Sequence, residues 1–176
     1  MKFFTVLLLT AGSSVAIRAV SKPEGSGITS RFSFFSPNGV TVASDGSNVN
    51  LDVKVSISGL TPNQNYTYHI HEAPVPADGN CTLTKLHFDP LKANKLDGKY
   101  VCNPKDITTC ELGDMSGIYG KAIVSKAGEI YENKFSIPKL NLYPGNMFYV
   151  GDLSVVIHDG TSKRVACANI NKLKKC

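Results

Sequence analysis

Residues 49–57, Val49-Asn-Leu-Asp-Val-Lys-Val-Ser-Ile57, alternate apolar and polar side chains without interruption. Because successive side chains of a strand point to opposite faces, all the apolar side chains of this stretch share one face. A strict period of two is typical of a half-buried strand that packs one face on a core. The stretch therefore predicts a β-strand and places the chain among proteins built from β-sheets.

Further segments with strand character lie on both sides of this stretch, separated by turn residues or by long irregular segments. They are Thr29–Phe35, Val40–Ala43, Tyr66–Glu72, Gly117–Val124, Tyr131–Ile137, Phe148–Ile157 and Val165–Ile170. Short strands at this spacing predict an all-β fold, an antiparallel Greek-key barrel or sandwich of about eight strands. Residues 73–113 have no such period, and we expect them to form a long ordered loop that carries function.

The first residues have the pattern of an export leader. Lys2 precedes a mostly apolar stretch that is shorter than the roughly 20 residues needed to span a membrane. We expect residues 1–19 to be a signal peptide cleaved after about residue 16 or 19, with a buried N-terminal element as the alternative. Residues 20–170 would then form the domain, and residues 171–176 a basic tail.

The net charge and the distribution of apolar residues indicate which partners and which location to expect. The net charge is +5, and no basic stripe is interleaved with aromatic residues, so we expect no nucleic-acid partner. No second apolar segment and no hydrophobic C-terminal tail follow the leader, so we expect neither a membrane span nor a GPI anchor. These features predict a secreted protein, in the medium or at the cell surface or wall.

Five cysteines in an exported chain predict disulfide bonds. The short spacing favours a local bridge between Cys102 and Cys110, which would leave Cys81 to pair with Cys167. Cys176 is then either a free thiol on the tail or a link between two chains. Asn65-Tyr-Thr67 and Asn80-Cys-Thr82 are acceptor sequences for N-glycosylation at Asn65 and Asn80.

The chain has four histidines, and each ends or follows a strand-like segment. His69 and His71 are separated by one residue, so they share one face of a strand. His87 lies in the loop that follows, and His158 ends the apolar run of residues 153–158. Imidazole suits copper, zinc, iron and nickel, and nitrogen-only tetragonal coordination favours copper. Spacing alone also fits an incidental surface pair, because it does not show that the four rings converge.

Six motifs in the same order resemble the copper/zinc superoxide dismutase family over roughly residues 27–170. They are Val53-Lys-Val-Ser-Ile-Ser-Gly-Leu60, Tyr68-His-Ile-His-Glu72, Asn80-Cys-Thr82 with His87-Phe-Asp-Pro90, Gly113-Asp-Met-Ser116, Val155-Val-Ile-His158 and Arg164-Val-Ala-Cys167. The resemblance implies that His69, His71, His87 and His158 bind one copper ion per chain. It also implies a Cys81–Cys167 bridge and makes Arg164 the active-site arginine.

Two departures from the family pattern make the chain resemble its copper-only extracellular branch. No histidine lies between His87 and Asp114, where the family places zinc ligands, so we expect no zinc. The long charged loop before the arginine is also missing, because only residues 159–163 separate His158 from Arg164. In that branch an acidic residue three positions before the aspartate belongs to the site, and Glu111 matches it.

The resemblance implies that the chain converts superoxide to O₂ and hydrogen peroxide by alternating Cu(II) and Cu(I). Arg164, His87 and Glu111 would be its catalytic residues, with His87 carrying a proton and Arg164 attracting the anion. Because a ligating histidine usually donates its second N–H to an acceptor, Glu111 or Asp114 is expected to hold His87. The rival functions are a non-enzymatic copper carrier and a structural domain. We expect a monomer unless Cys176 links two chains.

Overall fold

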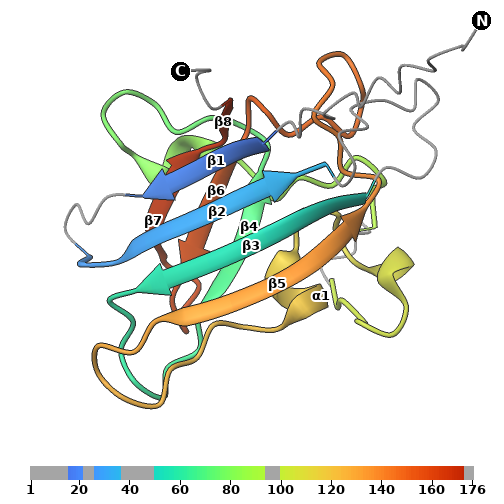
Figure 1. Ribbon diagram of the computed structural model, residues 1–176. Helices are drawn as coiled ribbons and strands as arrows, with labels where there is room; N and C mark the ends of the chain where they lie inside the picture. Colours follow the sequence, from blue (N-terminus) through green and yellow to red (C-terminus); the bar gives the residue numbers. More distant parts are fainter. Residues whose placement is uncertain (1–15, 22–25, 37–49, 94–99, 173–176) are drawn as a thin grey trace, which may run out of the picture.

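The computed structural model describes residues 16–21, 26–36, 50–93 and 100–172, and two antiparallel sheets face each other in this part of the chain (Figure 1). The larger sheet has the order β5 (Tyr131–Pro138), β3 (Asn50–Ser58), β2 (Thr29–Phe35), β1 (Ala16–Ser21) and β8 (Asn171–Lys172). The smaller sheet has the order β4 (Thr67–His71), β6 (Ser154–His158) and β7 (Arg164–Asn169).

The core lies between the two sheets, and the alternation of β3 shows how it forms. The apolar side chains of β3 are buried at every second position, in agreement with the half-buried strand predicted there. Val53 pairs with Phe34 of β2 and Phe135 of β5. Across the layer, the ring of Phe32 lies 5.7 Å from the ring of Tyr68 on β4. The inner faces of both sheets therefore supply the hydrophobic contacts that stabilise the fold.

The expected closed barrel is not formed by the described strands, because other segments occupy the free edge of β4. Ile70 N–H donates to the carbonyl of Gly113 at 2.9 Å, and Tyr66 exchanges hydrogen bonds with Ala122. A Cβ atom at Gly113 would lie 2.6 Å from the Ile70 carbonyl oxygen, so only glycine permits this approach. The segment around residues 113–122 thus takes the position where a neighbouring strand would close a barrel.

Six of the eight expected segments contain strands in the described residues. The strand predicted for residues 117–124 is wrong, because its first residues belong to α1 (Met115–Tyr119), which has Asp114 as its N-cap. The expected strand at residues 40–43 lies outside the described residues. The expected segment 148–157 is a strand only from Ser154 onward. Strands β1 and β8 were not predicted, since each depends on pairing with a distant partner.

Strand β1 bears on the expected leader. It begins at Ala16 and pairs with β2 from Ala16↔Phe35 to Ser21↔Ser30. Cleavage after residue 19 would remove most of this strand, whereas cleavage after residue 16 would keep nearly all of it. None of the helices in the described segments is both long enough and apolar enough to cross a membrane.

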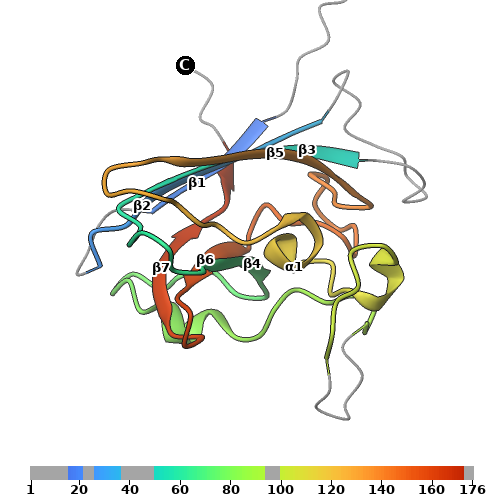
Figure 2. The same cartoon turned by 90° about the horizontal axis from the view of Figure 1, so that it is seen from below.

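The long loop after β4 covers the outer face of the smaller sheet (Figure 2). Its described residues contain two short 3₁₀ helices, η2 (Cys81–Thr84) and η3 (Ile107–Thr109). Disulfides join Cys81 to Cys167 of β7 and Cys102 to Cys110 within the loop. The first bridge pins η2, and with it this described part of the loop, to the smaller sheet.

Lys85, directly after η2, has a backbone conformation that favours glycine. Its φ is 63° and its ψ is −144°, a region in which a side chain causes strain. We expect Lys85→Gly to raise the free energy of unfolding by about 1 kcal/mol, because relief of this strain exceeds the added entropy of the unfolded chain. Denaturant unfolding of the oxidised, copper-free protein measures the change.

The matched control is Lys121→Gly, at an exposed lysine that is not among the residues with positive φ. That substitution should lower the free energy of unfolding, since it only adds flexibility to the unfolded chain. Equal destabilisation by both glycines would show that Lys85 is not strained.

Candidate metal centre

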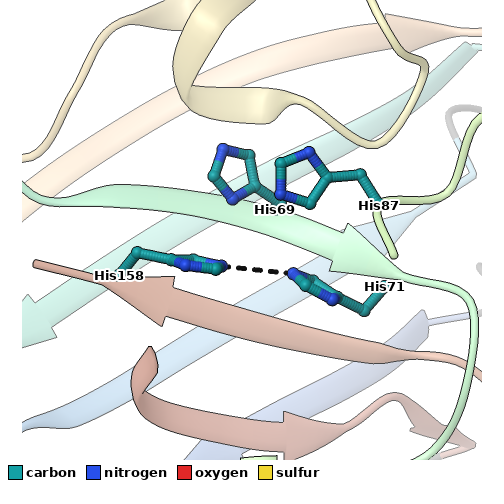
Figure 3. A group of neighbouring side chains, drawn as sticks. All are labelled: His69, His71, His87 and His158. Atoms are coloured by element: carbon teal, nitrogen blue, oxygen red, sulfur yellow. Dashed lines mark hydrogen bonds between the residues drawn. The ribbon is translucent and has the colours of Figure 1, made fainter. Parts of the chain in front are cut away.

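Four imidazole rings converge on the outer face of the smaller sheet (Figure 3). His69 and His71 project from the same face of β4. Tyr68 and Ile70, which alternate with them in the sequence, enter the core from the opposite face. His158 is paired with Thr67 of β4 across the β4–β6 ladder and so projects from this same face.

The fourth ring comes from the loop. His87 forms a β-bridge with His71, which brings its ring over the same face. One ligand atom from each of the four histidines lies within 4.8 Å of all the others. Within the described residues this is the only group of three or more potential ligands so close together. The convergence that the resemblance implied is therefore present in the tertiary structure.

Three of the rings are anchored through Nδ1, which leaves Nε2 facing the centre. Nδ1 of His71 lies 3.1 Å from the Lys85 carbonyl, and Nδ1 of His158 lies 3.1 Å from the Ser162 carbonyl. Because carbonyl oxygens only accept hydrogen bonds, both rings carry their proton on Nδ1. The Nε2 atoms of His71 and His158 approach to 3.2 Å (Figure 3). Their lone pairs thus point into one small space.

His69 has the opposite orientation and supplies the clearest evidence that the site fits a metal. Its Nε2 lies 3.3 Å from Asp114 Oδ1 and 3.3 Å from Ser116 Oγ. Its Nδ1 is buried and has no hydrogen-bond partner among the described residues. A buried polar atom without a partner is costly, and a metal ion would satisfy it. The four inward nitrogens form a nitrogen-only donor set, which suits copper.

The electrostatics keep these rings in the form that binds a metal. Burial lowers the pKa of His71 to about 3 and that of His158 to about 4. Burial also lowers the pKa of His69, against the opposing effect of Asp114. Because metal ions bind neutral imidazole, the lowered pKa of each of the three rings favours the form with an available lone pair.

The two acidic residues hold different rings. Glu111 Oε2 accepts a hydrogen bond from His87 Nδ1 at 2.5 Å, whereas Asp114 contacts His69. Burial alone would raise the pKa of Asp114, but hydrogen bonds from His69, the Gly117 N–H and Tyr100 lower it to about 2. Asp114 therefore stays charged while it caps α1 and orients a candidate ligand.

Tyr100 belongs to this network and was not predicted from the sequence. Its hydroxyl donates to Asp114 Oδ2 at 2.9 Å and accepts from the Glu111 N–H at 3.0 Å. Burial raises the pKa of Tyr100 well above its ordinary value, so the hydroxyl stays protonated. A tyrosine in an irregular loop has no local pattern that reveals these partners, and only the folded loop brings them together.

Arg164 is held beside the histidines by the loop. It pairs with His158 across the β6–β7 ladder, so the two side chains start from neighbouring positions. Its Nη1 donates to the carbonyls of Cys81 at 2.8 Å and Thr82 at 3.1 Å, and its Nη2 donates to the Lys85 carbonyl at 2.5 Å. The guanidinium is thus fixed by neutral acceptors and keeps its full positive charge.

The other predicted residues lie away from the four rings. Asn65 and Asn80 are both exposed, and the Asn80 side chain accepts hydrogen bonds from Thr82 N–H and hydroxyl. Cys176 lies outside the described residues. No described carboxylate or histidine forms a second cluster that could hold another metal.

Comparisons with known proteins agree with this geometry. The chain is 32% identical to the Candida albicans proteins named cell surface superoxide dismutase [Cu-Zn] 4 and cell surface Cu-only superoxide dismutase 5, over 92% of its length. It spans 62% and 63% of those two relatives. The solved structure of Candida albicans superoxide dismutase 5 with Cu(II) is similar to this fold, with a TM-score of 0.70 and 30% identity. That match covers 93% of this chain and 95% of the other.

A family described as copper/zinc superoxide dismutase matches residues 38–170, which include all four histidines and Arg164. The match covers well over half of the chain. The chain therefore belongs to the copper/zinc superoxide dismutase family.

Proposed function

We propose that the protein is an extracellular copper-only superoxide dismutase with one copper ion per chain. The observation that carries this proposal is the set of four inward-facing imidazole nitrogens, each anchored on its other side, next to a fixed arginine. A carrier or storage protein would need the four rings but not Arg164. The arginine therefore favours an enzyme that attracts a small anion over a protein that only holds copper.

Each part of the site has a role in this reaction. Copper, when bound, supplies the Cu(II)/Cu(I) couple that oxidises one superoxide to O₂ and reduces another to peroxide, with uptake of two protons. His69, His71, His87 and His158 would hold the ion, and Arg164 would attract and orient the anion. His87 donates its Nδ1–H to Glu111, and its Nε2, which faces the centre, would bind copper or carry a proton when it is not bound to copper.

The use of the described side chains supports a site without zinc. All four histidines of the chain belong to one cluster, and Glu111 and Asp114 already accept from His87 and His69. A structural zinc site needs four protein ligands, and a catalytic site needs three. In this proposal the His87–Glu111 hydrogen bond replaces the zinc ion that orients the corresponding histidine elsewhere in the family.

We further propose that the chain is exported and acts at the cell surface or in the medium as a monomer. Two relatives are named cell surface enzymes, and the chain has a leader-like N-terminus and two disulfides. The exposed Asn65 and Asn80 are accessible to glycan attachment. Recovery of an uncleaved chain from the cytosol would contradict this location.

The first prediction that tests this function concerns activity. The copper-loaded protein should consume superoxide, and His158→Ala should lose both copper and activity. Arg164→Ala should keep copper but lower kcat/KM by about tenfold or more, because it removes the cation that receives the anion. Arg31→Ala, at an exposed arginine on the larger sheet, is the matched control and should change neither property. A wild type that binds copper stoichiometrically but leaves superoxide intact would favour the carrier function.

The second prediction concerns metal content. Protein refolded with equal amounts of copper and zinc, and then dialysed, should retain about one copper per chain and only traces of zinc. Elemental analysis measures both metals in one sample. Tightly held zinc in a one-to-one ratio beside copper would overturn the copper-only proposal.

The third prediction concerns Glu111. Glu111→Gln removes the charge that holds His87, so copper affinity or dismutase activity should fall about 10- to 100-fold. Competition with a copper chelator and a superoxide assay measure the two effects. Glu72→Gln makes the same change at an exposed residue directly after His71, and it should behave like wild type. Equal effects of the two substitutions would show that the His87 contact is unimportant.

A further inference from the structure

The hydroxyl of Thr84 lies where the loop, the arginine and one candidate copper ligand meet. Thr84 ends η2, and its side chain is fully buried. Its Oγ1 donates to the Cys81 carbonyl at 2.8 Å and accepts from Arg164 Nη1 at 2.9 Å. The same oxygen lies 3.3 Å from His71 Nδ1. A hydroxyl has one donor and two acceptor sites, so these three contacts use all of them.

A second acceptor makes the same connection. The Lys85 carbonyl lies 3.1 Å from His71 Nδ1 and 2.5 Å from Arg164 Nη2. His71 and Arg164 therefore share two acceptors that are adjacent in the chain, one from a backbone and one from a side chain. The backbone carbonyl is present whatever residue occupies position 85, but the hydroxyl at position 84 depends on threonine or serine.

We propose that Thr84 is a positioning residue that couples the guanidinium of Arg164 to the copper ligand His71. Thr84 itself touches no reacting atom. Its hydroxyl keeps Nη1 turned toward the loop, which sets the direction of the remaining guanidinium N–H groups, and it limits rotation of the His71 ring. This proposal deepens the proposed function, because it rests on an anion that approaches Arg164 beside the bound copper.

Thr84→Val tests the coupling, because valine has nearly the same shape as threonine but no hydroxyl. The Cys81, Thr82 and Lys85 carbonyls still hold the arginine in this variant, so the fold has most of its contacts. Azide is the probe for anion binding, and a titration of the Cu(II)-loaded protein followed by absorbance gives its Kd. We expect Thr84→Val to raise this Kd about three- to tenfold, as for loss of one charge-assisted hydrogen bond.

Two further measurements separate positioning from a general structural effect. The Cu(II) electron paramagnetic resonance spectrum should change in Thr84→Val, because His71 loses a contact. In an Arg164→Ala background, Thr84→Val should leave the azide Kd unchanged, because the group through which it acts is gone. The same loss of affinity with and without Arg164 would overturn the proposal, as would an unchanged Kd and spectrum in the folded single variant.

Thr84→Ser restores the hydroxyl and should recover azide affinity to within about twofold of wild type. Thr108→Val is the matched control, because the exposed Thr108 hydroxyl donates to Asp106, the N-cap of η3, in the same way that a 3₁₀-helix hydroxyl contacts its cap. Thr108→Val should match wild type, and an equal effect of both valines would contradict a specific role for Thr84.

The wild type provides the test if Thr84→Val does not fold. In the Cu(I)-loaded, nitrogen-15-labelled protein, Arg164 should give separate, slowly exchanging Nη1 proton signals, and one of them should show a nuclear Overhauser effect to the Thr84 side chain. Averaged, fast-exchanging guanidinium signals would overturn the proposal. A wild type that binds azide but does not consume superoxide would contradict the proposed function and would still permit the Thr84 comparison.

Discussion

The alternation of side chains along β4 is the constraint on which both the core and the metal centre depend. Tyr68 and Ile70 enter the core between the sheets, and this places His69 and His71 together on the opposite face. A shift of one residue in the β4–β6 register would exchange the two sets of side chains. The same hydrophobic contacts that stabilise the sandwich therefore keep the two imidazoles on the outer face, where the loop covers them.

The loop is held on that face by groups that also belong to the site. The Cys81–Cys167 disulfide and the Arg164 hydrogen bonds both connect β7 with η2. The Lys85 carbonyl accepts from His71 and from Arg164, and the strained backbone of Lys85 directs it there. The contacts that hold the folded loop on the sheet thus also fix Arg164 in place. This explains why a strained conformation is retained at this position.

The two acidic residues orient two of the four imidazole rings. Glu111 holds His87 and Asp114 holds His69, so each carboxylate sets which nitrogen of its ring faces the centre. Tyr100 connects the Asp114 side chain with the Glu111 backbone, so the two are placed relative to each other. One network of hydrogen bonds in the loop therefore orients two of the four imidazole rings.

The sequence by itself determined the strand periodicity, the set of candidate ligands and the lack of further histidines. These are properties of neighbouring residues or of composition, and they needed no knowledge of the fold. The strand prediction failed at residues 117–124, where the Asp114 cap and packing beside β4 produce a helix. The sequence also did not reveal β1 or β8. Those elements depend on partners far away in the chain.

Only the tertiary structure decided which nitrogen of each ring is free, that Glu111 and not Asp114 holds His87, and that Thr84 joins Arg164 to His71. Strand periodicity is a local property that the covalent geometry of the backbone imposes. The direction of an imidazole or guanidinium depends on hydrogen-bond partners that come from other strands and from the closed loop. The sequence therefore identified the candidate ligands, while the strand register and the closure of the loop determined how their side chains are arranged around one centre.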